Sequence, residues 1–201
     1  MSYPNWPVDL KPDRIEWRLV GNVQRFTSAL TGGTQSLALP GARWVATVTF
    51  GRRQGAAARR LLAQMALLTS AGRVWLPVFD RLTPYGTAAG AGVVEGAAQT
   101  GATLNTDGWT PSQTGVLLAG DYVQVGDGLH MITEDIDSDG AGAAALKLAP
   151  ELRSSPADGA TVITSAPRVL MELIDDQQSA WAVQAPAVYA ISFGLREVFD
   201  V

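Results

Sequence analysis

The chain has 201 residues, of which 47% are hydrophobic, enough to bury one good core together with a small satellite module. It contains no cysteine, which excludes thiol catalysis, thiolate metal sites and a disulfide framework, and suits folding in a reducing compartment such as the bacterial cytoplasm. The N-terminus has no basic segment followed by an apolar stretch, and no run of about 18 apolar residues occurs, so we expect neither a signal peptide nor a membrane-spanning segment.

The net charge of −4 conceals a strong asymmetry along the chain. Residues 1–85 carry 11 basic against 4 acidic side chains, giving +7, and residues 86–166 carry 2 against 10, giving −8. Residues 167–201 carry 2 against 5, giving −3. Thirteen of the 15 basic residues are arginine, whose planar guanidinium favours bidentate contacts at protein interfaces, although GC-rich codon usage predicts the same bias. The change of sign near residue 86 indicates a boundary there.

Strand signals dominate the first fifty residues. Residues 15–19 and 44–50 alternate apolar with polar side chains, which predicts two strands with one solvated face each. Turn residues at 32–33 and 40–41 punctuate the region between them, where residues 37–39 predict another short strand.

A single helix follows. Residues 56–70 are rich in Ala, Leu and Arg, and their large apolar side chains recur at helical spacing. This stripe consists of Leu61, Leu62, Met65 and Leu68. It predicts an amphipathic helix over about residues 55–71, ended by Gly72 in the left-handed conformation. Residues 73–78 then predict a short strand at a sheet edge, because Pro77 has no backbone N–H to donate.

The middle of the chain differs in composition from the first 85 residues. Residues 86–102 contain almost no bulky side chains and predict a flexible Gly/Ala-rich connector. The strands predicted beyond it are short, and cover residues 115–125, 129–134, 143–148 and 160–164. Asp139-Gly140 is a strong hairpin-turn signal, and it predicts that the second and third of these strands pair across residues 138–140.

Three further strands are predicted at the C-terminal end, over residues 168–174, 180–184 and 189–195. The last strand is the most apolar and needs the aromatic face of the N-terminal strands as its partner. We therefore expect residues 1–85 and 167–201 to form one β-rich core domain, with residues 86–166 as an inserted acidic, β-rich module. The expected fold is mainly β with one amphipathic α-helix: a β-barrel or sandwich domain with a flanking helix, interrupted by a small antiparallel β insert domain.

An acidic stretch in the insert is the first candidate site. Asp135, Asp137 and Asp139, followed by Gly140, match the first six positions of a calcium loop. The twelfth position, which should be a bidentate glutamate, is Leu146. The pattern therefore favours a solvated hairpin tip, and cation binding by the three aspartates stays open.

The signals for catalysis are weak. The one histidine, His130, lies in a predicted strand, and no Gly-x-Ser-x-Gly elbow occurs, which favours a residue of the sheet face. Hydrolysis of glycans by carboxylates would have to use acids such as Glu134, Glu172 and Asp176, which resemble ordinary turn charges. We therefore expect no enzyme, no catalytic residue, no metal and no cofactor.

A basic cluster, Arg52, Arg53, Arg59 and Arg60, surrounds the start of the predicted helix. It lacks the interleaved aromatic residues and the recognition-helix motif of nucleic-acid-binding proteins. We expect a solvated helix face or salt bridges at a subunit interface, and no specific nucleic-acid binding.

Three segments of the core domain follow one another in a recognisable order. They are residues 39–50 (LPGARWVATVTF) leading into the helix, residues 74–77 (VWLP) and residues 189–198 (YAISFGLREV). In this order the chain resembles the distal tail and minor tail proteins of long-tailed bacteriophages. Residues 118–126 (LAGDYVQVG) and 148–153 (LAPELR), with the acidic hairpin, resemble the module that some of these proteins carry. The chain departs from the shortest members by this insert, and from others by carrying it mid-chain.

The resemblance implies a structural component of the phage tail tip or baseplate. Such a protein forms a ring, usually hexameric, that joins the tail tube to the hub and tail-fibre apparatus. The implied partners are further copies of the chain, the tail tube protein and the baseplate hub protein, with a tail fibre or host-surface glycan beyond them. The implied location is the virion tail tip, assembled in the host cytoplasm, without membrane insertion.

Two other functions are compatible with the sequence. A carbohydrate-binding module attaching the virion to the host surface would use exposed aromatic residues of the insert, for which Trp109 and Tyr122 are available. A glycan hydrolase is the second alternative.

Overall fold

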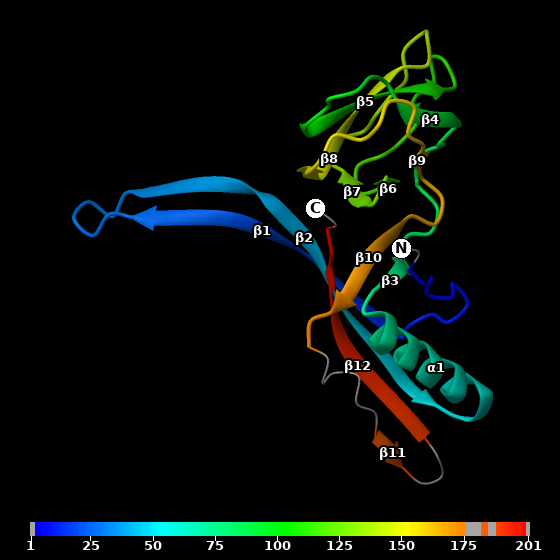
Figure 1. Ribbon diagram of the computed structural model, residues 1–201. Coiled ribbons are helices and arrows are strands. Elements are labelled where there is room, and N and C mark those ends of the chain that lie inside the picture. The colour runs from blue at the N-terminus through cyan, green and yellow to red at the C-terminus, as the bar shows by residue number, and fades with distance from the viewer. Residues whose placement is uncertain (1–2, 176–181, 185–187, 200–201) are drawn as a thin grey trace.

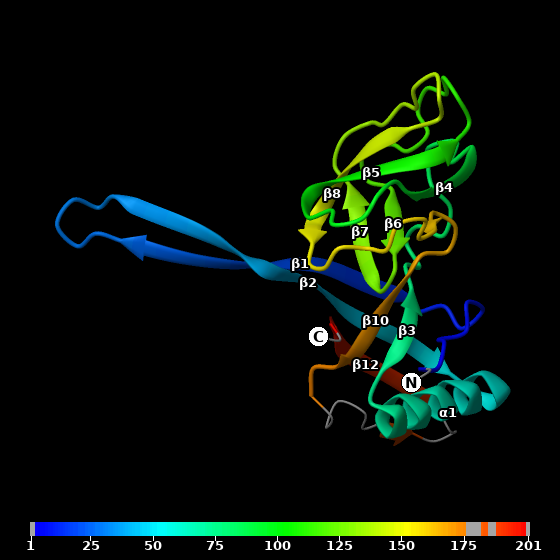
Figure 2. The same cartoon turned by 45° about the horizontal axis from the view of Figure 1, so that its top comes forward.

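The computed structural model describes residues 3–175, 182–184 and 188–199. These residues form twelve strands and one helix, which confirms the predicted mainly β fold with a flanking helix. Figures 1 and 2 show three parts: a core domain with the helix, a second sheet seated on it, and a long two-stranded hairpin that leaves the core domain sideways.

Both ends of the chain build the sheet of the core domain. Its strand order is β1-β2-β12-β10-β3, with β11 pairing with β12, and all of these pairs are antiparallel. The bounds are β1 Arg14–Thr27, β2 Thr34–Arg53, β3 Val74–Pro77, β10 Arg168–Leu173, β11 Ala182–Gln184 and β12 Val188–Glu197. As expected from its apolar face, the closing strand β12 lies beside β2 in the middle of the sheet.

The helix α1, Gly55–Ala71, has the predicted bounds. It buries one stripe of its surface, formed by Ala58, Leu61, Met65 and Leu68. Gly72 ends it with a φ of 73°, and its N–H donates to the Leu68 carbonyl at 2.8 Å. Only a residue without a Cβ takes up this left-handed backbone at no steric cost, so the predicted C-terminus is confirmed.

Aromatic rings fill the centre of the core domain. Trp6 stacks on Phe50 with 5.8 Å between the ring centroids, and Phe50 stacks on Phe193 at 6.3 Å. The segment around Trp6 also follows the outer edge of β3, because the Trp6 N–H donates to the Trp75 carbonyl and the Trp75 N–H donates to the Pro4 carbonyl, both at 2.9 Å. This covers an edge that would otherwise offer unpaired backbone groups.

The residues between β3 and β10 form a second sheet, the module. Its order is β4-β5-β8-β7-β6-β9. The bounds are β4 Gly90–Val94, β5 Gly101–Trp109, β6 Tyr122–Val125, β7 Gly128–Ile132, β8 Ala144–Leu152 and β9 Val162–Ile163. Val93 bridges Thr161, and the Val94 N–H donates to the Ala160 carbonyl at 2.9 Å, so the two outer strands meet and the sheet curls into a nearly closed barrel.

The prediction of a flexible connector over residues 86–102 is wrong. This segment contains β4 and the beginning of β5. Its small residues serve close packing: a Cβ on Gly92 would overlap the Trp109 ring, and a Cβ on Gly86 would overlap the backbone of Val116. Glycine composition alone does not separate a loose chain from one packed this closely.

The acidic stretch is not a tight hairpin turn. Met131 pairs with Ala149 and Ile132 with Leu148, which confirms the predicted pairing of the two strands. The register leaves residues 133–143 as a long loop between them, with its turn at 140–141. Of the strand predicted over residues 115–125, only the last four residues form β6.

The module rests directly on the core domain. Tyr122 and Leu129 of the module belong to the apolar core of the core domain, and the Trp44 indole N–H donates to the Leu129 carbonyl at 2.9 Å. The chain also turns into the module around a buried carboxylate, Asp121, which accepts the backbone N–H of Tyr85 at 2.6 Å and of Gly86 at 2.9 Å. The two parts are therefore joined by packed and hydrogen-bonded surfaces.

The largest departure from the sequence prediction is the length of β1 and β2. The sequence predicts short strands over residues 15–19 and 44–50, with another short strand over residues 37–39 in the punctuated region between them. Instead, two long strands pair up to Thr27 and Thr34 in one hairpin, with a register irregularity between Val20 and Asn22. We call residues 20–39 the arm. Figures 1 and 2 show that the arm extends well beyond both the core domain and the module.

Candidate functional site

The arm presents large apolar side chains to solvent. The exposed fractions are 43% for Val23, 63% for Phe26, 97% for Leu30 and 54% for Leu37. Scattered exposed apolar residues are normal, but a group of them on one thin projection is typical of an interaction surface. The arm is therefore the first candidate functional site.

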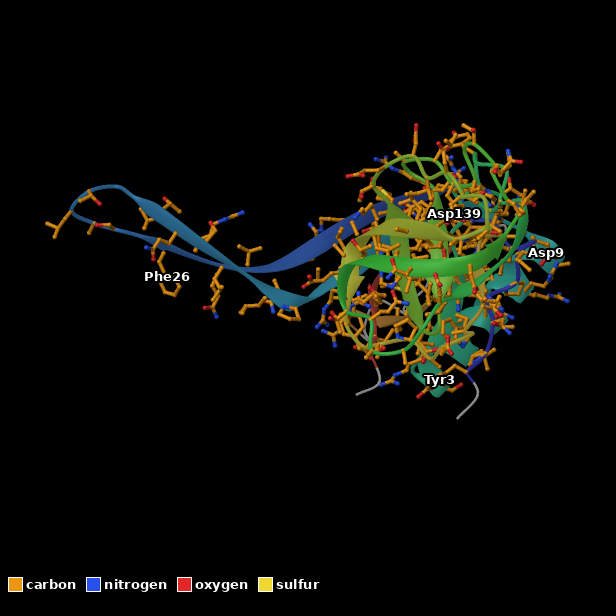
Figure 3. The ribbon with its side chains drawn as sticks, turned by 90° about the horizontal axis from the view of Figure 1, so that it is seen from above. Tyr3, Asp9, Phe26 and Asp139 are labelled. Atoms are coloured by element: carbon orange, nitrogen blue, oxygen red, sulfur yellow. The ribbon has the colours of Figure 1, made fainter. Side chains whose placement is uncertain are left out.

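The strand register divides the arm into two faces. Phe26 lies opposite Gln35, and Leu37 lies opposite Gln24. Because directly opposed residues of an antiparallel pair point to the same side, Phe26 and Leu37 share one face with the two glutamine amides. In Figure 3 Phe26 projects from the ribbon, well away from Asp139 of the module. This face combines apolar area with side-chain hydrogen-bond donors.

The edges of the arm are open as well. Within the described residues, β1 has β2 as its one partner strand, and β2 pairs with β12 only from Val45 onward. A two-stranded ribbon is at best marginally stable alone in water, and unpaired strand edges are templates for other strands. Few contacts within the chain hold the arm, among them the Asn22 side chain, which donates to the Pro40 carbonyl at 2.9 Å. A partner that covers the arm would remove this cost.

The arm lies in a stretch of the chain whose charged residues are all basic. No acidic residue lies between Glu16 and Asp80, and the arginines there include Arg18 and Arg25 on β1 and Arg43 on β2. A partner surface for this stretch should therefore be acidic.

The predicted interface arginines fall into two groups. Arg53 pairs with Asp13 and Arg60 with Asp9, each at 2.8 Å, and both bonds lower the pKa of the aspartate. Arg52 and Arg59 are exposed and make no ion pair within the part of the chain that the structure describes. These last two are free to meet acidic groups of a partner.

A cavity of about 530 Å³ lies at the base of the arm. Three regions of the chain line it: the arm base at residues 40–41, the module at residues 125–130 and 152–156, and the end of β12 with the following residues at 198–199. The module side of this cavity carries the exposed carboxylate Asp127. Its volume lies in the usual range of binding pockets, roughly 300–1,000 Å³.

One wall of the cavity is fixed by a buried ion pair. Glu197 is 1% exposed, and its carboxylate accepts N–H groups of Arg153 at 3.0 and 2.6 Å and the Trp44 backbone N–H at 2.9 Å. Arg153 also donates to the Ala42 carbonyl at 2.6 Å, and its guanidinium lies 3.6 Å from the centroid of the Phe199 ring. We call these residues the clasp. It ties the end of β8 to β2 and β12, and so holds the module at a fixed position beside the arm base.

The single histidine lies within β7 beside this cavity. His130 is 2% exposed, and its Nδ1 lies 2.7 Å from the Pro150 carbonyl, so the Nδ1–H donates there. Burial lowers the pKa of His130 from 6.5 to about 4, which keeps the ring neutral and leaves Nε2 as an acceptor. The bonded partner is a backbone carbonyl and not a hydroxyl, an arrangement that positions the ring in the sheet.

The three aspartates of the predicted calcium loop bind backbone N–H groups. Asp135 accepts the N–H of Ala119 at 2.9 Å, and Asp137 accepts that of Gly115 at 2.7 Å. Asp139 accepts two N–H groups of its own loop at 2.8 Å, and these bonds lower its pKa. Among the described residues, no cluster of three or more acidic, histidine or cysteine side chains could hold a metal ion.

The predicted aromatic platforms are wrong. Trp109 is 4% exposed, packs in the core of the module and donates its indole N–H to Thr106 Oγ1 at 2.8 Å. Tyr122 is 5% exposed, and its ring centroid lies 5.7 Å from that of Trp44; burial raises its pKa to about 12. Neither ring offers a face to a glycan, because both fill space between strands.

The acids considered for hydrolysis do not form a site within the described residues. Glu172 pairs with Arg196 at 2.7 Å, and Glu134 is exposed on the loop after β7. Asp176 lies outside the described residues.

A comparison of the sequence with models of known protein families gives no match, and a comparison with curated proteins gives none either. In the described part of the chain, no helix is long and apolar enough to cross a membrane. The main candidate functional features are thus the arm, the cavity at its base and the division of charge along the chain.

Proposed function

We propose that this chain is a structural component of a phage tail tip or baseplate, which assembles into a ring joining the tail tube to the hub and tail-fibre apparatus. The observation that carries the proposal is the arm, whose side chains Phe26, Leu30 and Leu37 are exposed among the residues that the structure describes. The order of the sequence segments, which resembles that of distal tail and minor tail proteins, supports a place in a phage tail.

A ring needs contacts between two different surfaces of each subunit. Such head-to-tail contacts close when the rotation between neighbours returns to the start, and a hexamer is the closure that the resemblance implies. A projecting arm suits this purpose, because it reaches past its own core domain and buries its apolar side chains only against another molecule.

The remaining features are compatible with a rigid subunit of a larger assembly. The clasp and the shared apolar core hold the module on the core domain, so that each subunit would add to the assembly as one body. Arg52 and Arg59 offer exposed charges near the helix start for contacts to the tail tube or hub protein. Charges of this kind contribute specificity and register more than affinity.

Assembly of the purified chain tests the proposal. Sedimentation velocity and negative-stain electron microscopy should show rings, either of the chain alone or with the tail tube and hub proteins of the same phage. A variant in which Asn-Gly replaces residues 23–38 should fold and remain monomeric, since Asn22 and Leu39 are paired and accept a two-residue turn. A wild-type chain that stays monomeric with both partners would contradict the proposal.

A further inference from the structure

We infer that the arm of one copy docks in the cavity at the arm base of a second copy, with the face that carries Phe26 and Leu37 against the cavity wall. The inference rests on the self-association proposed above and names the receptor surface for it. The occupant is thus a second copy of this chain.

The apolar character of the two surfaces matches. The cavity is lined by Val125, Leu152, Pro156, Val198 and Phe199 among others, and its volume of about 530 Å³ has room for more than one large side chain. The arm offers Phe26 and Leu37, which share one face and are each more than half exposed. Docking would remove both surfaces from water at the same time.

The arm and the module carry net charges of opposite sign. The arm lies in a stretch without acidic residues, whereas residues 86–166 carry 2 basic against 10 acidic side chains. The cavity lining follows this division: Asp127 is exposed, while Arg153, its one basic residue, is already neutralised by Glu197. Arg25, the one charged residue of the arm, lies opposite Ser36 and therefore on the face away from Phe26. With Phe26 in the cavity, this positive charge would lie outside the apolar contact, beside the acidic module, whereas arm-to-arm contact would bring two such charges together.

The hydrogen-bonding groups also correspond. The His130 Nδ1–H is bound to the Pro150 carbonyl, so Nε2 is left as an acceptor, and it lies close to Gly128 of the cavity lining. The arm face with Phe26 carries the amide groups of Gln24 and Gln35, which can donate. A donor aimed at a buried acceptor would add orientation to the apolar contact.

The shape of the subunit makes the contact intermolecular. Pro40 and Gly41 at the base of the arm line the cavity. The hairpin extends away from the core domain, with its tip far from its base (Figures 1 and 2), so the tip cannot reach the cavity of its own subunit. Each copy would therefore dock its arm on one neighbour and accept the arm of another neighbour in its own cavity. Contacts of this head-to-tail kind generate a ring when they close.

The absence of native cysteine allows a direct test in the full chain. We would prepare Gln35→Cys, on the arm face with Phe26, and Asp127→Cys, at the cavity, and mix them with a short bis-maleimide. Glu134→Cys is the matched control, an exposed acid of the module outside the cavity lining. The mixture of the first two variants should give at least about tenfold more crosslinked dimer than the mixture of Gln35→Cys with the control.

Further variants and outcomes distinguish this contact from other modes of association. Phe26→Asp added to Gln35→Cys should reduce the crosslinking to the control level, and because Phe26 is exposed this variant should still fold. Equal yields with Asp127→Cys and Glu134→Cys, or crosslinking of Gln35→Cys with itself, would overturn the inference in favour of another receptor or of paired arms. If wild-type rings form without the specific crosslink, only this inference fails; if no association occurs at all, the proposed function fails with it.

Discussion

Replacing Arg153 of the clasp with methionine should destabilise the chain strongly. Glu197 would stay 1% exposed and keep the Trp44 N–H as its donor, while the two N–H groups of Arg153 would be lost. Removing one partner of a buried ion pair costs about 3–5 kcal/mol, because the remaining charge is left uncompensated. In a chain of this size each kcal/mol lowers Tm by about 2–4 °C, so we expect a decrease of roughly 6–20 °C.

Two further variants separate the ion pair from general damage. The double variant Arg153→Met with Glu197→Leu should recover part of the loss, since it leaves no buried charge unpaired, while the Trp44 N–H loses its acceptor. Arg14→Met, which breaks a surface pair with side chains 73% and 56% exposed, should change the free energy of unfolding by only about 0–1 kcal/mol.

Urea denaturation followed by tryptophan fluorescence measures these changes. Trp44 is a suitable reporter, because its backbone N–H binds Glu197 and its indole N–H binds Leu129 of the module. A loss below about 1 kcal/mol for Arg153→Met, or a double variant as unstable as the single one, would refute the view that the clasp is a dry, mutually dependent ion pair.

Three other changes test particular contacts. The pKa of His130 is about 4 in the folded chain and 6.5 ordinarily, so between these pH values the unfolded chain binds a proton that the folded chain does not. The free energy of unfolding should therefore fall by up to roughly 3 kcal/mol as the pH drops from about 6.5 to about 4. In urea titrations, His130→Phe should flatten this pH profile. Gly92→Ala should cost about 1–3 kcal/mol by overlap with the Trp109 ring, whereas Gly140→Ala, with open space around it, should stay within about 0.5 kcal/mol; equal thermal shifts would contradict this packing. Asp121→Asn should lower the free energy of unfolding by at least about 2 kcal/mol in urea denaturation, because an amide cannot accept all the backbone N–H groups that the carboxylate holds. An unchanged urea midpoint would argue against Asp121 holding the chain at its entry into the module.

Features that depend on local pattern could be predicted from the sequence. The helix, its buried stripe and its end at Gly72 follow from helical spacing and one glycine. The central place of β12 followed from the apolar alternation around Phe193, which only a buried strand would keep. These elements bury their apolar side chains inside the chain itself, so composition and structure agree.

The arm could not be predicted in the same way. Its residues mix polar and apolar side chains without a buried face, and the irregularity between Val20 and Asn22 interrupts the alternation. In the described part of the chain, Phe26 and Leu37 stay more than half exposed. Periodicity detects burial within a fold, and an arm that projects into solvent has none to detect.

The cavity and the clasp depend on contacts between distant segments. Arg153 and Glu197 are 44 positions apart, and neither lies in a motif. Trp109 and Tyr122 were reasonable glycan platforms by residue type, but whether a ring is exposed depends on the strands packed around it. The same reason explains the error over residues 86–102, where glycines make room for an indole ring placed by another strand.

The strand β2 has a mechanical consequence. It runs unbroken from Thr34 at the arm tip into the middle of the core sheet, where it pairs with β12 from Val45 to Arg53. Backbone hydrogen bonds in such a ladder lie across the strands, so tension along the arm would load many of them in shear together, whereas a sideways pull would open them one after another. A subunit held by its arm would therefore resist pulling along the arm far better than twisting or peeling, and force would pass into the centre of the core domain without crossing a loop.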